Sequence, residues 1–179
     1  VNKNSVSYTR NMIQKNMIIS EGSVLSSVYI DNLHITDGIE NNGSLTISGG
    51  STSDTNIFGK GSLTITSDQL DFGNNSIIQD NLSISTNRAY GDGLMINADN
   101  FKIANAIQNS GSIVFIGGTN TNNINSVSTS SIVNIGDGKT PVVVSNEGVI
   151  DCETLVKTNA TLNNMSESGI LGSVTVNDG

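Results

Sequence analysis

The sequence is poor in charge, proline and cysteine, and it has no tryptophan. Only 13% of the 179 residues are Asp, Glu, Lys or Arg, about half of the usual share. Because the apolar content is ordinary once glycine is included, this low charge argues against an intrinsically disordered chain. The single proline, Pro141, is the one position that removes a backbone donor, so long hydrogen-bonded ladders are possible along the chain.

The scarcity of cysteine and of long apolar runs excludes further classes. With only Cys152, the chain forms neither an intrachain disulfide nor a cysteine-rich zinc site. No run approaches the ~18 apolar residues of a membrane helix. The opening VNKNSVSYTR lacks the apolar segment of a signal peptide. A start without Met indicates a processed protein or an excised fragment.

Basic residues are also few, 8 against 16 acidic ones, which gives a net charge of −8. Nucleic acid is therefore not an expected partner, because phosphate binding needs a basic face. Basic residues gather only at Lys3, Arg10 and Lys15, a group more typical of a solvated chain end than of a binding patch. Residues 1–16 carry no clear apolar pair, and we expect an N-terminal segment or cap there.

Asparagine, serine and glycine are abundant where charged residues are few: the chain has 26 Asn and 19 Gly. Asn and Ser bond their own backbone in turns, and Asn tolerates left-handed conformations. A chain of this composition is therefore expected to contain many turns.

Short apolar phrases recur along the chain. GSLTI occurs at Gly43–Ile47 and again at Gly61–Ile65, eighteen residues later. Apolar residues alternate with Thr, Ser or Asn in such phrases, and a period of two is typical of a strand with one buried face. A first series of apolar pairs has spacings of 17, 18, 19 and 19 residues: Val28/Ile30, Leu45/Ile47, Leu63/Ile65, Leu82/Ile84 and Phe101/Ile103.

Two more series accompany the first. The second repeats every 19 residues: Leu94/Ile96, Ile113/Phe115 and Ile132. The third is weaker: Leu70/Phe72, Ile107 and the run Val142–Val144. Gly- and Asn-rich turn signals separate the pairs. The best helix candidate, Ala104–Gln108, is too short to stand alone.

Three short strands in each period of 18–19 residues favour an all-β, right-handed parallel β-helix of roughly eight coils over residues 17–179. In this geometry residues one period apart stack at the strand spacing of about 4.8 Å. Leu45 should then stack on Leu63, Ile47 on Ile65 and Ser44 on Ser62. Stacked Asn side chains at turns are expected to bond along the axis. The apolar pair is lost at Thr119–Asn123, so an irregular coil is expected near 117–126.

No motif in the sequence defines a reaction. GDGKT at Gly136–Thr140 lacks the first glycine of a phosphate-binding loop and is interpreted as a turn between strands. His34 alternates with Leu33 and Ile35, so it should point away from the face they share, and it has no second His or Cys to complete a zinc site. Carboxylates beside Cys152 would raise its pKa rather than activate the thiol.

Acidic and aromatic residues give no sign of a polysaccharide-cleaving enzyme either. The closest acidic pairs, Asp68/Asp71 and Asp151/Glu153, do not repeat at the coil spacing, whereas such enzymes cluster carboxylates for acid–base work or calcium. The four phenylalanines lie in strand-like contexts and are expected in the core: Phe58, Phe72, Phe101 and Phe115. The sequence thus predicts no catalytic residue, no cofactor and no metal site.

The segments GSLTISGG, GSLTITSD, NLSISTN, GSIVFIGG and GSVTVNDG resemble passenger domains of bacterial autotransporters, over most of residues 17–179. The resemblance implies a secreted or surface-displayed β-helix, extracellular and anchored in the outer membrane through a C-terminal translocator barrel outside this fragment. It carries over no functional residue.

The resulting expectation is a non-enzymatic adhesin or structural stalk. It would be a monomer that binds a protein or glycan on a host or neighbouring cell through its lateral face. Two alternatives stay open: a segment of a phage tail spike or tail fibre, which would be trimeric, and a polysaccharide-active β-helix enzyme.

Overall fold

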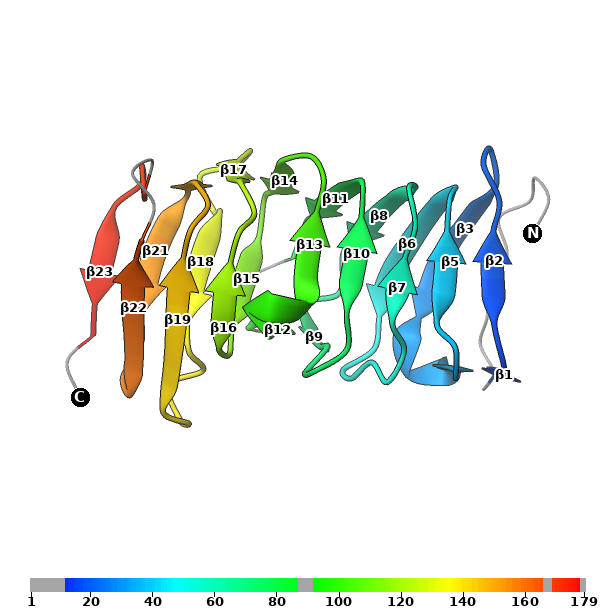
Figure 1. Ribbon diagram of the computed structural model, residues 1–179, viewed down its shortest axis with the longest axis horizontal. Coiled ribbons are helices and arrows are strands. Elements are labelled where there is room, and N and C mark those ends of the chain that lie inside the picture. Colours follow the sequence, from blue (N-terminus) through cyan, green and yellow to red (C-terminus); the bar gives the residue numbers. More distant parts are fainter. Residues whose placement is uncertain (1–11, 87–91, 166–168, 178–179) are drawn as a thin grey trace.

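The computed structural model describes residues 12–86, 92–165 and 169–177. The chain forms an all-β parallel solenoid of about eight turns with only 3% helix, which confirms the predicted fold class. Figure 1 shows the turns stacked side by side from the N-terminal to the C-terminal end. Its nearer strands point upward while the chain advances from right to left, as in a right-handed coil.

One side of the solenoid, nearest the viewer in Figure 1, carries two sheets in a row. The five-stranded sheet contains β2 (Met17–Ile19), β5 (Ile39–Asn41), β7 (Ile57–Phe58), β10 (Ile77–Gln79) and β13 (Phe101–Ile103). The three-stranded sheet contains β16 (Gly118–Asn120), β19 (Val142–Asn146) and β22 (Ala160–Asn164). All pairings in both sheets are parallel.

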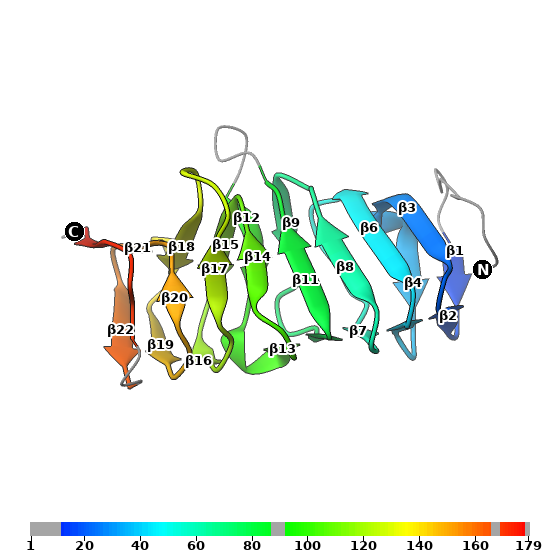
Figure 2. The same ribbon diagram turned by 90° about the horizontal axis from the view of Figure 1, so that it is seen from above.

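The second side is a seven-stranded parallel sheet, which faces the viewer in Figure 2. Its strands are β3 (Val24–Tyr29), β6 (Ser44–Gly49), β8 (Ser62–Ile65), β11 (Asn81–Ile84), β14 (Ile107–Asn109), β17 (Ile124–Ser126) and β20 (Ile150–Asp151).

The third side contains a six-stranded sheet and the pair β1 (Met12–Gln14) and β4 (Leu33–Ile35). The six strands are β9 (Gln69–Asp71), β12 (Gly93–Ile96), β15 (Ser112–Phe115), β18 (Ile132–Ile135), β21 (Glu153–Val156) and β23 (Val174–Val176). Two short 3-10 helices, η1 (Ile30–Asn32) and η2 (Ala98–Asn100), lie between strands.

Equivalent residues of successive turns stack as the repeat predicts. Leu45 pairs with Leu63 and Ile47 with Ile65, and Ser44 pairs with Ser62. The next turn continues the column, because Leu82 pairs with Leu63 and Ile84 with Ile65. These aliphatic side chains are buried, so each turn covers the apolar surface of the previous one.

Several predicted column assignments are wrong. Phe101 pairs with Ile77 in the five-stranded sheet and does not stack on Leu82. The seven-stranded sheet instead continues from Ile84 to Asn109, 25 residues further along. This turn is longer than the repeat, so the fixed period assigns the later pairs to the wrong side.

Two smaller register errors have the same kind of cause. Ile113 pairs with Val133, whereas Ile132 pairs with Ser112, because that turn has one residue more than predicted. Val28 pairs with Ile47 rather than with Leu45. A bulge in β3, where Ser27 has a φ of 58°, shifts the register there.

The third predicted series is not a column at all. Leu70 pairs with Leu94 and so belongs to the second series. Ile107 pairs with Ile124 in the seven-stranded sheet, and Val144 pairs with Gly118 on the side shown in front in Figure 1.

Buried polar side chains join the turns in addition to the backbone. Asn146 accepts a hydrogen bond from Asn120 Nδ2 and donates one to Asn164 Oδ1, both at 2.8 Å, which confirms the predicted Asn ladder. Near the N-terminal end the Thr55 hydroxyl takes the place of a backbone group: it accepts from the Ile35 N–H at 3.2 Å and donates to the Leu33 carbonyl at 2.9 Å.

Strands occur both in the expected N-terminal segment or cap, residues 1–16, and near the expected irregular coil, residues 117–126. Residues 1–11 of the proposed cap, with Lys3 and Arg10, lie outside the described residues. Met12–Gln14 form β1, which pairs with β4. Within 117–126, β16 and β17 each pair with the following turn, although β16 does not pair with β13 before it.

Candidate functional site

The outer surface of the five-stranded sheet is the strongest candidate for a functional site. Successive side chains of a strand point to opposite faces, so each short strand here places one residue outward. These residues lie in register from turn to turn. We call this column the β2–β13 face: Ile18, Glu40, Phe58, Ile78 and Lys102.

Large apolar side chains on this face are exposed to solvent. Ile18 is 51% exposed, Ile78 46% and Phe58 37%. Phe58 is adjacent to Ile78 in the sheet, so the two form one apolar surface between a glutamate and a lysine. Clustered exposed apolar residues on a soluble domain mark an interaction surface more often than isolated ones do.

The prediction that Phe58 belongs to the core is wrong, whereas the other three phenylalanines are buried. In the two-residue strand β7 the side chain of Ile57 points inward, so that of Phe58 must point outward. Gly59 then occupies the next inward position with a φ of +129°, and a Cβ there would lie 2.3 Å from the Asn41 carbonyl oxygen. The side chains of Asn41 and Gln79 meet across this glycine, with Nδ2 and Oε1 2.7 Å apart.

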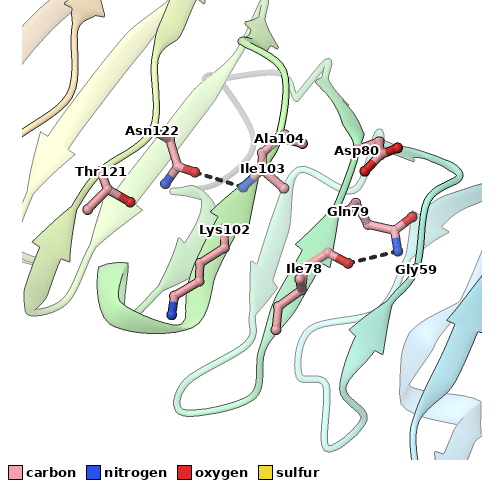
Figure 3. Close-up of a pocket in the computed structure, with 9 residues that line it drawn as sticks. All are labelled: Gly59, Ile78, Gln79, Asp80, Lys102, Ile103, Ala104, Thr121 and Asn122. Atoms are coloured by element: carbon pink, nitrogen blue, oxygen red, sulfur yellow. Dashed lines mark hydrogen bonds between the residues drawn. The ribbon is translucent and has the colours of Figure 1, made fainter.

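A pocket of about 310 Å³ extends along the β2–β13 face from Gly59 and Ile78 to the end of the face, where β13 and β16 do not pair with each other. The amide of Asn122 spans this break. Its Oδ1 accepts from the Ile103 N–H at 2.8 Å and its Nδ2 donates to the Phe101 carbonyl at 2.7 Å. Figure 3 shows this side chain reaching the Ile103 backbone nitrogen, with Thr121 and Lys102 on either side of the break.

A second pocket, of about 690 Å³, lies at the other end of the face. Ile18, Glu21, Glu40 and Lys60 are among the residues that line it. Glu40 accepts a hydrogen bond from the Asn42 side chain at 2.8 Å. Within the part of the chain that the structure describes, neither Lys60 nor Lys102 forms a salt bridge. One end of the face thus carries two glutamates with Lys60, and the other carries Lys102 with Asp80.

His34 lies on another side of the solenoid and has an acidic partner. Its side chain points outward, as predicted, and Nδ1 lies 2.7 Å from Asp54 Oδ2. The hydrogen bond with His34 is the main reason why the pKa of Asp54 is below its ordinary value. Both side chains are largely solvated, 42% and 59% exposed.

The small pocket beside this pair does not form a catalytic triad. Asp31 and Ser51 line the pocket of about 270 Å³ together with His34 and Asp54. The Asp31 carboxylate accepts backbone N–H bonds from Ser51 at 2.8 Å and Thr52 at 2.8 Å, so it holds the next turn in place. The Ser51 hydroxyl is directed to the Asp31 carboxylate, at 3.5 Å, rather than to His34.

Cys152 and the segment Gly136–Thr140, which were also considered from the sequence, have contacts that serve the fold. Cys152 is buried, and burial is the main cause that raises the pKa of its thiol. The segment Gly136–Thr140 is a turn between β18 and β19, as predicted. There the Asp137 carboxylate accepts the N–H groups of Thr140 and Lys139, and these bonds lower its pKa.

The acidic pairs do not combine into a site. Asp71 Oδ1 accepts the Gly73 N–H at 2.7 Å, whereas Asp151 and Glu153 lie on consecutive strands, β20 and β21. Across the described ranges, no group of three or more His, Cys, Asp or Glu side chains is arranged to hold a metal ion. Within those same ranges no helix has the length and apolar character required to cross a membrane.

The fold and the face define the chain as a parallel β-solenoid with one partly apolar lateral surface. A scan of protein-family models and searches of curated proteins and of solved structures found no match. A function must therefore be inferred from the residues of this chain.

Proposed function

We propose that this chain is a non-enzymatic binding segment of a secreted or surface-displayed bacterial protein, similar in role to an autotransporter passenger. Its β2–β13 face contacts a protein or glycan on a host or neighbouring cell, and the rest of the solenoid acts as a stalk that presents this face. Stacked turns can fold one after another, each on the previous one, which suits a protein that emerges from a secretion pore.

One observation carries the proposal: Phe58 and Ile78 point outward and are exposed, side by side, in the middle of a regular sheet. Buried positions in the same strands are well filled by Ile57 and Ile77, so the exposed residues are not needed for the core. Aromatic and aliphatic residues surrounded by polar ones are typical of the centre of a binding surface.

A binding assay with surface variants tests this function. The 179-residue chain would be applied to a panel of bacterial cells, host cells, matrix proteins and glycans. We expect the double variant Phe58→Ser, Ile78→Ser to lose most of the binding. The control Val127→Ser removes an apolar residue outside the face that is 54% exposed, and it should bind normally. Equal binding by all variants, or a native chain that binds neither the panel nor a second copy of itself, would refute the proposal.

Two further measurements separate the proposal from the functions that the sequence leaves open. Release of reducing ends from a glycan panel would support a polysaccharide-cleaving enzyme. A trimer in sedimentation experiments would support a tail-spike or tail-fibre segment.

A further inference from the structure

We infer that the β2–β13 face binds a second copy of this chain, face to face and antiparallel, about a two-fold axis parallel to the strands and midway between β7 and β10. The inference rests on the proposed function of this face and names its partner. The inference is based on four outward residues that follow one another on consecutive strands. Their order is acid, apolar, apolar and base: Glu40, Phe58, Ile78 and Lys102.

When this order is reversed on a second copy, each charged residue faces one of opposite charge and each apolar residue faces an apolar one. A rotation about the stated axis reverses the sequence of turns but leaves each residue at the same height along its strand. Phe58 of one copy then faces Ile78 of the other, and Glu40 faces Lys102. Adjacent strands are about 4.8 Å apart throughout a sheet, so the steps match on both copies. Because such an interface is isologous, every contact occurs twice.

A second column of charges obeys the same symmetry. Lys60 and Asp80 each follow the end of a front strand, two residues after Phe58 and Ile78, which are paired in register. The chain from Phe58 to Ser62 is one residue longer than the chain from Ile78 to Asn81, and Ser62 and Asn81 are again paired, so Lys60 and Asp80 lie at similar but not identical heights on adjacent turns. In the antiparallel dimer Lys60 of one copy faces Asp80 of the other. The complementarity thus covers two independent acid–base pairs, each of which is formed twice.

The pockets at the ends of the face also correspond. One step beyond Glu40 is Ile18, and one step beyond Lys102 is the break in the sheet, where the pocket that extends along the face from Gly59 ends. Ile18 of one copy would enter this pocket, part of which is formed by Ile103 and Ala104. Lys102 of the other copy would reach the larger pocket, where Glu21 accompanies Glu40.

Like charges beside the face are already compensated. Asp37 and Asp99 precede their strands at the opposite edge of the face, and the symmetry would bring them near each other. Asp37 has Lys15 Nζ at 3.9 Å, and Asp99 Oδ1 accepts the Thr119 N–H at 2.9 Å. A monomer is the expectation from sequence alone; the dimer follows from the register, which places residues far apart in the sequence in one column.

Charge reversal with sedimentation equilibrium tests the inference. Over a wide concentration range the native chain should show a monomer–dimer equilibrium. Glu40→Lys and Lys102→Glu should each weaken the dimer about tenfold or more, since each creates two like-charge contacts. An equimolar mixture of these two variants should form a heterodimer in which one of the two Glu40–Lys102 contacts is kept and the other is reversed in sign. Pairs of opposite charge then replace all like-charge contacts, so dimerisation should recover. The double variant should recover for the same reason.

Two controls match the charge changes at exposed sites away from the face: Glu147→Lys and Lys139→Glu should dimerise like the native chain. Circular dichroism would verify that all variants are folded. A native chain that stays monomeric, or a double variant that does not recover, would overturn the inference. If the chain is monomeric yet Phe58→Ser, Ile78→Ser abolishes binding to another surface, the proposed function stands and its partner is not a second copy. If the native chain does not dimerise and the double variant binds other surfaces as well as the native chain does, both the inference and the proposed function are refuted.

Discussion

Replacing Asn122 by alanine should weaken the contact between the two halves of the solenoid, which the seven- and six-stranded sheets also join. In the native chain the Asn122 amide substitutes for a backbone pairing between β13 and the following turn, through bonds of 2.8 Å and 2.7 Å. Asn122 is 3% exposed. The substitution leaves the Ile103 N–H and the Phe101 carbonyl without this partner, and both point towards the following turn at the unpaired edge of β13.

The expected loss follows from these two groups. An unsatisfied buried donor or acceptor costs about 1–3 kcal/mol, so two of them give roughly 2–6 kcal/mol. The neighbouring pocket, which Ile103 also lines, admits water and reduces the cost. We therefore expect a loss of about 3 kcal/mol, a large part of the ~5–15 kcal/mol that stabilises an ordinary domain.

Urea unfolding and amide hydrogen exchange measure this effect. Turns of a solenoid interact only with their neighbours, so a weakened contact between two turns should split a single transition into two. The Ile103 amide should exchange slowly in the native chain and rapidly in Asn122→Ala. Thr121→Ala, at the same pocket, should change stability by less than about 0.5 kcal/mol. An unchanged unfolding curve with a still-protected Ile103 amide would refute the bridging role of Asn122.

Three other predictions follow from the core and from the titratable groups. Leu63→Ala should lower the free energy of unfolding by about 2–5 kcal/mol, because this side chain is buried between two turns; a loss under about 1 kcal/mol would contradict the stacked core. The pKa of Asp54 is lowered mainly by its hydrogen bond with His34, so this contact stabilises the fold above the ordinary pKa of 3.8, and the stabilisation is lost as the pH falls through the folded-state pKa. Acid titrations of stability should therefore show a small advantage of the native chain over Asp54→Asn that disappears at low pH. Cys152, with its raised pKa and buried thiol, should react slowly with a thiol reagent in the native state and quickly in urea; equal rates would contradict its burial.

The sequence was sufficient to predict the parallel solenoid because neighbouring turns repeat nearly the same length. GSLTI at Gly43 and Gly61 gives the correct pairing of Leu45 with Leu63, down to the outward serines. Like residues stack on like residues in such a core, and the period in the sequence therefore has a direct structural meaning.

Later columns could not be assigned from a fixed period because turn lengths vary. The seven-stranded sheet passes from Ile84 to Asn109, and a longer connection leaves no mark that distinguishes it from a shift to another side. Phe101 falls on the expected period and still belongs to a different sheet. A pattern of two apolar residues specifies that a strand has an inner face, but not which sheet it joins.

The candidate face was missed for a related reason. Ile77 and Ile78 are adjacent and equally apolar, so the sequence does not indicate which of them points outward. Phe58 also looks like a core residue until Gly59 is seen to occupy the next inward position. The signal that could have identified the exposed phenylalanine is the glycine that follows it. In the neighbouring turns Asn41 and Gln79 occupy the equivalent position. The Asn ladder was predictable because stacked Asn side chains can bond one another in any register-matched column, although its members end strands β16, β19 and β22 rather than lying in turns.

The stacking of Leu63 between Leu45 and Leu82 is tested most directly by backbone proton–proton contacts in a nuclear Overhauser spectrum of the isotope-labelled chain. The parallel solenoid predicts in-register contacts between the strands of Leu45 and Leu63 and between those of Leu63 and Leu82, with none between Leu45 and Leu82. An antiparallel contact pattern, or direct contacts between the strands of Leu45 and Leu82, would contradict it.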